Sequence, residues 1–204
     1  MPLDTERGNP APLGLVGFGL TTVLLSLVNA GLLPGEGEAV VLPLAFAFGG
    51  TAQFVAGILE FRTGNTFGQT AFFSYGAFWW WFGLLVLFDG NGWLSIHTPT
   101  LGAALVLWGV FTFYMWIATF RLNWGLWSVF LTLWITFALL GFGDLLGIGA
   151  LGVAGGYVGI LSGALAMYVS FAEVVNWSFA RTVAPIGSAP IADSSSETTA
   201  DTAD

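Results

Sequence analysis

The sequence predicts an all-α membrane protein whose chain crosses the bilayer six times. Only 8% of its 204 residues are charged and 56% are hydrophobic, whereas soluble domains carry about 25% charged residues. Six apolar stretches approach or exceed the length of about 20 helical residues that crosses a hydrocarbon core. All four arginines lie at the ends of these stretches that fall on one side of the membrane. These three observations predict one compact transmembrane unit embedded in a lipid bilayer.

The apolar stretches follow one another with short polar breaks between them. We expect membrane spans at residues 13–33, 39–60, 66–88, 100–120, 124–142 and 148–177. The sixth stretch is long enough to tilt or to extend beyond the bilayer. The chain therefore divides into an N-terminal segment (1–12), a six-helix transmembrane domain (13–181) and an acidic tail (182–204). The tail is rich in Ser, Thr, Ala and Asp, a composition that predicts disorder.

The distribution of charge predicts the orientation of the spans. The arginines, which precede span one or follow spans two, four and six, are Arg7, Arg62, Arg121 and Arg181. The opposite connections contain no Lys or Arg, and their charged or titratable residues are Glu36, Glu38, Asp89, His97 and Asp144. Cytoplasmic loops carry the excess of basic residues, so we expect a multi-pass protein of the cell membrane with both termini, and with them segments 1–12 and 182–204, in the cytoplasm.

A threefold repeat is one interpretation of the arginine spacing. Arg62, Arg121 and Arg181 are 59 and 60 positions apart, and the first two end similar tripeptides, EFR and TFR. This spacing predicts three helical hairpins in series around a central pore in each protomer. The alternative is that short loops between six spans produce such spacing by accident.

The composition also excludes several classes of protein. The chain has no cysteine and no lysine, which rules out disulfides, thiolate metal sites and Schiff-base pigments. The single histidine, His97, cannot make a two-histidine metal or haem site. An enzyme needs convergent catalytic acids, bases or metal ligands, and the centres of the spans offer none. We therefore expect no enzyme activity, no cofactor, no metal and no nucleic-acid partner.

Polar residues inside the spans are the candidates for function, because such groups are costly in a bilayer. The central sections contain no charged residue, and two carboxylates, Glu60 and Glu173, lie towards the arginine side. They are interpreted either as members of interfacial charge pairs or as groups that handle protons or substrate. The uncharged polar residues expected to line a hydrated path are Thr21, Thr22, Asn29, Gln53, Asn65, Thr66, Thr70 and Ser74. The alternative for the hydroxyls is a bond to the helix's own carbonyl one turn back.

Several tryptophans lie near the predicted span ends or loops. Trp79, Trp80 and Trp81 are among them. We interpret most of this group as an interfacial aromatic belt.

The segment before and within span one carries a specific motif. Residues 9–22 read NPAPLGLVGFGLTT, and residues 49–79 read GGTAQFVAGILEFRTGNTFGQTAFFSYGAFW. Together with AEVVNWSFARTVAPIG near the end, these strings resemble the acetate uptake transporter family. That family includes bacterial succinate–acetate transporters and fungal ammonia/acetate export proteins. The resemblance covers about residues 9–187.

The resemblance implies a six-helix protomer that assembles into a homohexamer. It implies that each protomer has its own pore for acetate and similar small monocarboxylates, with succinate also in question, and that it works as a channel or as a proton-coupled carrier. It further implies a pore constriction at Phe18 in GFG, Tyr75 in SYG and Leu133 in FLTLW. An alternative that fits the same charge-free path is a channel for urea, ammonia or small amides.

Overall fold

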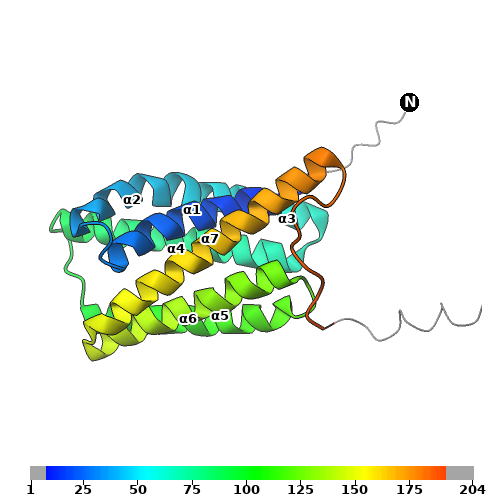
Figure 1. Ribbon diagram of the computed structural model, residues 1–204. Coiled ribbons are helices and arrows are strands. Elements are labelled where there is room, and N and C mark those ends of the chain that lie inside the picture. The colour runs from blue at the N-terminus through cyan, green and yellow to red at the C-terminus, as the bar shows by residue number, and fades with distance from the viewer. Residues whose placement is uncertain (1–7, 192–204) are drawn as a thin grey trace, which may run out of the picture.

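The computed structural model describes residues 8–191, which form an all-helical bundle (Figure 1). Six of its helices are long and apolar enough to cross a membrane, which confirms the predicted fold class. Span one is α1 (Ala11–Asn29), and span two consists of η1 (Gly35–Gly37), α2 (Glu38–Leu44), η2 (Ala45–Ala52) and α3 (Gln53–Thr63). The other spans are α4 (Thr66–Gly90), α5 (Thr98–Thr119), α6 (Trp124–Leu146) and α7 (Gly149–Phe179).

The first helix begins and ends earlier than predicted. Asn9 Oδ1 accepts a hydrogen bond from the Ala11 backbone N–H at 3.0 Å, which caps one of the free donors that every helix start leaves. The helix ends at Asn29 although apolar residues continue to Leu33, because Gly31 has a φ of +71° and turns the chain. The end of this span predicted from hydropathy therefore lies one helical turn beyond the observed end.

The six spans form a closed ring, and each neighbours the next in sequence. α7 packs along α1 and closes the ring, while α5 packs along α6 and α6 along α7. Among the pairs that neighbour each other in the ring, α4 and α5 approach least closely, and large side chains such as Tyr75 and Phe111 meet between them. We call the end of the bundle that carries Arg62, Arg121 and Arg181 the arginine face. The end that carries Glu36, Glu38, Asp89 and Asp144 is the acidic face; the two faces are the right and left ends of Figure 1.

Glycine allows the ring to close tightly between α1 and α7. A Cβ atom added to Gly19 would lie 2.7 Å from the carbonyl oxygen of Gly163, and the reverse distance is also 2.7 Å. Such contact between backbones is typical of helix pairs in membranes, where small residues let helices approach. Gly163 and Gly19 therefore let the backbones of α1 and α7 pack directly against each other.

The second span changes its helical geometry at mid-length. Pro43 lies inside α2, and the segment that follows, η2, is a π-helix in which the Thr51 hydroxyl donates to the Phe46 carbonyl at 2.8 Å. π-Helical turns occur frequently at functional sites. A Cβ atom on Gly49 would lie 2.8 Å from the Trp79 ring, which places η2 directly against α4. Trp79 is only 1% exposed, so its interpretation as an interfacial residue is wrong.

The chain after α7 does not leave the bundle at once. The backbone N–H groups of Trp124 and Gly125 donate to the carbonyls of Ser188 and Ile186, at 3.1 and 2.8 Å. In Figure 1 this orange-red segment crosses the arginine face from α7 to the ends of α5 and α6. The prediction of disorder from residue 182 is therefore wrong for residues 182–191, which cap the start of α6. Residues 192–204 and 1–7 lie outside the described residues.

Candidate functional site

A cavity of about 50 Å³ opens inside the bundle towards the arginine face. Residues of α1, α3, α4, α6 and α7 line it, together with the cap of α4, and we call it the arginine-side cavity. Its polar lining residues are Gln53, Glu60, Asn65 and Glu173. The three predicted constriction residues, Phe18, Tyr75 and Leu133, line the same cavity. Its volume has room for a few water molecules, so a solute larger than water needs side chains to move.

The constriction residues are buried among aromatic rings. The ring centroids of Phe18 and Tyr75 are 5.7 Å apart, and those of Tyr75 and Phe130 are 6.1 Å apart. Tyr75 is 3% exposed, and Leu133 is equally buried. Aromatic pairs at these separations attract one another in tilted geometries. Side chains of α1, α4 and α6 thus form an apolar layer at one boundary of the cavity.

A second apolar layer lies one helical turn beyond the first. Phe78 follows Tyr75 on α4, and Phe137 follows Leu133 on α6; their ring centroids are 5.2 Å apart. Both line another cavity, of about 230 Å³, on the side of the acidic face. Among the residues that the structure describes, none lines both cavities. The two layers therefore separate an arginine-side from an acidic-side cavity.

The Tyr75 hydroxyl is turned away from Phe18 and towards α5. It donates to Thr112 Oγ1 at 3.0 Å, and the Thr112 hydroxyl in turn donates to the Trp108 carbonyl at 2.8 Å. This chain of bonds fixes the ring between α4 and α5, where the backbones are far apart. Thr112 is thus a positioning residue for the constriction, and no signal in the sequence separated it from other helix hydroxyls.

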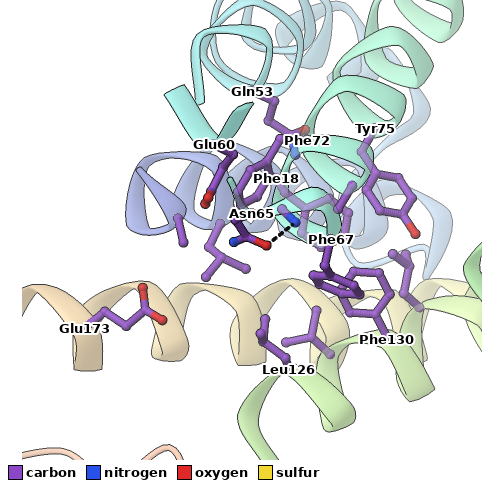
Figure 2. A pocket seen from close by; sticks show the side chains of 16 residues that line it. Phe18, Gln53, Glu60, Asn65, Phe67, Phe72, Tyr75, Leu126, Phe130 and Glu173 are labelled. Carbon is purple, nitrogen blue, oxygen red and sulfur yellow. Dashed lines mark hydrogen bonds between the residues drawn. The ribbon is translucent and has the colours of Figure 1, made fainter. Parts of the chain in front are cut away.

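Among the polar residues that line the arginine-side cavity, Gln53 has the properties expected of a solute-binding residue. Its side chain is 1% exposed, and neither Oε1 nor Nε2 has a hydrogen-bond partner within residues 8–191. Buried amides are nearly always hydrogen-bonded in folded proteins. Figure 2 shows the amide close to Phe72 and Phe18. The Nε2 donor and the Oε1 acceptor of Gln53 are therefore available to hydrogen-bond a solute beside the apolar layer.

Two carboxylates reach the same cavity from the two helices that flank α1. Glu60 lies on α3 and Glu173 on α7, and Figure 2 shows Asn65 near Glu60. Glu173 Oε2 accepts a hydrogen bond from Asn9 Nδ2 at 3.1 Å, and the Ser170 hydroxyl donates to the Pro12 carbonyl at 2.7 Å. The first residues of the NPAP string are thereby fastened to α7. The NPAP string marked this segment as a specific motif in the sequence. Nothing in the string indicated that it would bond to α7.

The remaining predicted pathway residues do not gather at this cavity. Asn29 lines the acidic-side cavity, and Ser74 faces a groove between α4 and α5. The other four, which line neither cavity nor that groove, are Thr21, Thr22, Thr66 and Thr70. The Thr21 hydroxyl donates to the Gly17 carbonyl at 2.8 Å, which is the alternative geometry expected for helix hydroxyls. The structure thus brings together Gln53, Asn65 and the constriction but not the hydroxyls.

A ring of six membrane-spanning helices, with two cavities separated by two apolar layers, is the architecture of a channel or transporter bundle. The chain belongs to the GPR1/FUN34/yaaH family, whose model matches residues 2–188. This confirms the resemblance carried by the NPAPLGL string, since the relatives include bacterial and fungal proteins of the expected kinds.

Several relatives are similar over most of the chain. The "Succinate-acetate/proton symporter SatP" of Escherichia coli is 44% identical over 90% of this chain and 97% of its own length. An uncharacterized protein of Methanothermobacter thermautotrophicus is 42% identical over 90% of this chain and 93% of its own. "Acetate permease A" of Emericella nidulans is 35% identical over 89% of this chain and 66% of its own. The structure titled "Structure of the bacterial acetate channel SatP" matches with a TM-score of 0.85 at 44% identity, over 89% of this chain and all of that one.

Proposed function

We propose that this protein carries acetate and related small monocarboxylates across the membrane. The observation that carries the proposal is the apolar layer of Phe18, Tyr75 and Leu133, beside which the Gln53 amide lies buried with no hydrogen-bond partner among residues 8–191. An amide there can replace part of the water around a small solute while the apolar ring limits its size. The names of the similar proteins support this choice of solute.

The chemistry of the path favours transfer of acetate together with a proton. An ionised carboxylate is very costly to bury without a partner, and the charged residues that line the arginine-side cavity are both acidic, Glu60 and Glu173. Protonation removes that cost, because the neutral acid has the polarity of an amide. A simple carboxylic acid has a pKa close to that of a Glu side chain, about 4.3. Uptake driven by the neutral acid therefore increases as the donor side becomes more acidic.

We also propose an orientation of the protein in the membrane and an oligomeric state. The arginine face lies in the cytoplasm and the acidic face outside the cell, because basic residues mark the inner ends of spans. The N-terminal segment 1–12 and the tail 182–204 are then both cytoplasmic. Six copies of the chain form a homohexamer, each with its own path, as its resemblance to the family implies.

The test is uptake of labelled acetate into proteoliposomes with an imposed pH gradient. We compare the native protein with Tyr75→Ala and with Tyr114→Ala, which removes an exposed ring of α5. Tyr75→Ala is expected to admit longer monocarboxylates, and the control is expected to behave like the native protein. Equal uptake of acetate with and without the gradient would argue against proton co-transfer. An unchanged size limit in Tyr75→Ala would remove Tyr75 from the constriction.

A second candidate is a channel for urea, ammonia or small amides. The Gln53 amide favours it, since an amide side chain pairs well with an amide solute. A competition experiment distinguishes the two candidate functions. If the protein carries acetate, unlabelled acetate reduces the uptake of labelled acetate and urea does not. Reduction by urea alone would favour the second.

A further inference from the structure

The acidic-side cavity lies on the axis of the ring. Its walls come from all six spans: α1, α2, α4, α5, α6 and α7 each contribute a lining residue. Three of these residues are polar, Asn29, Glu38 and Asp144, and the rest are apolar or glycine. Because Phe78 and Phe137 form its floor, a solute entering from the acidic face must occupy this cavity before it reaches the constriction.

Within residues 8–191, no Lys or Arg lines this cavity beside its two carboxylates. Asp89, at the end of α4, lies near enough to Glu38 to repel its carboxylate, and Asp89 Oδ1 accepts a hydrogen bond from the Ile96 N–H at 2.9 Å. The connections on this face contain no Lys or Arg. Their one titratable base, His97, pairs with Thr100 through Nδ1 at 2.8 Å. The acidic-side cavity thus holds two carboxyl groups, on a face whose connections carry only acidic titratable residues besides His97.

A negative cavity with apolar walls affects solutes according to their charge. Clefts lined by one sign of charge, with walls of low dielectric, produce potentials of several kT. A potential of about 2–3 kT lowers the local concentration of a monoanion about tenfold and that of a dianion about a hundredfold. The concentration of an uncharged acid is unchanged. Salt weakens the effect, because the Debye length falls from about 30 Å at 0.01 M to about 8 Å at 0.15 M.

We propose that Glu38 and Asp144 make the acidic-side cavity a charge filter that admits uncharged small acids, disfavours singly charged ones and rejects dicarboxylate dianions. The identity of the acids rests on the function proposed above, but the filter itself is a property of the cavity. Glu38 is placed by the start of α2 and Asp144 by the last turn of α6. The two residues are thus specificity-determining residues at the entrance, ahead of the constriction that limits size.

A thiol reporter measures this potential without any transport. The chain has no cysteine, so Asn29→Cys introduces a single thiol into the cavity wall. In detergent, where both faces are open, its reaction rates with a cationic and an anionic methanethiosulfonate are compared with those of a free thiol. We expect the cationic reagent to be favoured about a hundredfold at low salt, since each reagent gains or loses about tenfold.

Charge removal then tests which residues produce the potential. Adding Glu38→Gln and Asp144→Asn is expected to reduce the preference for the cationic reagent at least tenfold. The matched control is Glu36→Gln, which removes an equal charge from the same face but from an exposed residue outside the cavity. If Asn29→Cys with both carboxylates intact shows the same reagent preference as a free thiol, the filter is overturned. An equal loss of preference in the Glu36→Gln control would also overturn it.

Uptake experiments connect the filter to specificity. At pH 7 and low salt, Glu38→Gln with Asp144→Asn is expected to raise the ratio of succinate to acetate uptake about tenfold, and added salt is expected to raise the native ratio. If the reagent preference falls but the uptake ratio stays the same, the filter does not set specificity and the proposal fails. If the native protein moves no acetate at all, the proposed function fails, while the thiol measurement still decides whether the cavity is a charge filter.

Discussion

Replacement of Gln53 by methionine is expected to raise the stability of the bundle and to lower its transport activity. Gln53 is 1% exposed, and both polar atoms of its amide lack partners within residues 8–191. Mutational data put the cost of an unpaired buried polar group at about 1–3 kcal/mol. Methionine has a similar shape and no amide, so Gln53→Met is expected to stabilise the protein by about 1–3 kcal/mol. Acetate uptake is expected to fall, because the solute loses its hydrogen-bonding groups beside the constriction.

The measurement is thermal unfolding of the purified protein in detergent, paired with acetate uptake into vesicles. For a chain of this size, 1 kcal/mol shifts Tm by about 2–4 °C, so we expect a rise of about 2–12 °C. Gln69→Met is the matched control, since Gln69 lies on α4 outside the arginine-side cavity and is half-buried. A lower Tm for Gln53→Met would refute the claim that the amide is unpaired. A higher Tm with undiminished uptake would refute its role in passage.

Three further changes test the positioning of the spans. Tyr75→Phe removes the hydroxyl bond to α5 and should destabilise the protein by about 1 kcal/mol in thermal scans; it should retain acetate uptake, and lost uptake would mean that the hydroxyl itself contacts the solute. Gly163→Val forces a Cβ atom against the carbonyl of α1 and should cost about 1–3 kcal/mol or more, whereas Gly152→Val, which meets nothing within 4 Å, should leave Tm unchanged; similar effects of the two would contradict tight α1–α7 packing. Asn176→Ala removes three hydrogen bonds to residues 183 and 184 and should speed amide exchange in residues 182–191; unchanged exchange would show that other contacts hold this segment.

Hydropathy predicted the spans because membrane helices must be long and apolar whatever their neighbours are. The third and sixth spans begin and end within two residues of prediction, at 66–90 and 149–179. Hydropathy does not report which side of a helix faces the ring, however. Thr66 and Thr70 therefore looked equivalent to Gln53, although they line neither cavity. The three residues predicted to form the constriction came from resemblance of motifs, since an apolar residue inside an apolar span has no compositional signal of its own.

Irregular segments were the other features that the sequence left open. The π-helix of η2 lies directly against Trp79 and Trp80 of α4, a contact that no local sequence pattern encodes. Residues 182–191 have a composition typical of a solvated tail, yet their carbonyls pair with the free N–H groups at the start of α6. Orphan backbone donors at helix ends attract partners of any sequence, so side-chain composition was a poor guide to order there.

The closure of the ring by α1 and α7 has a consequence for biosynthesis. The Ser170 hydroxyl of α7 donates a hydrogen bond to the carbonyl of Pro12 in the first turn of α1, although 158 positions separate the two residues in the chain. At about 5–20 residues per second, the first helix waits about 8–30 s in the membrane before its main partner is made. During that time Gly19 and the rest of its packing surface face lipid or a helper protein. Nascent chains that end before α7 therefore have an open ring of helices. Quality-control proteases of the membrane have this interval in which to recognise the open ring.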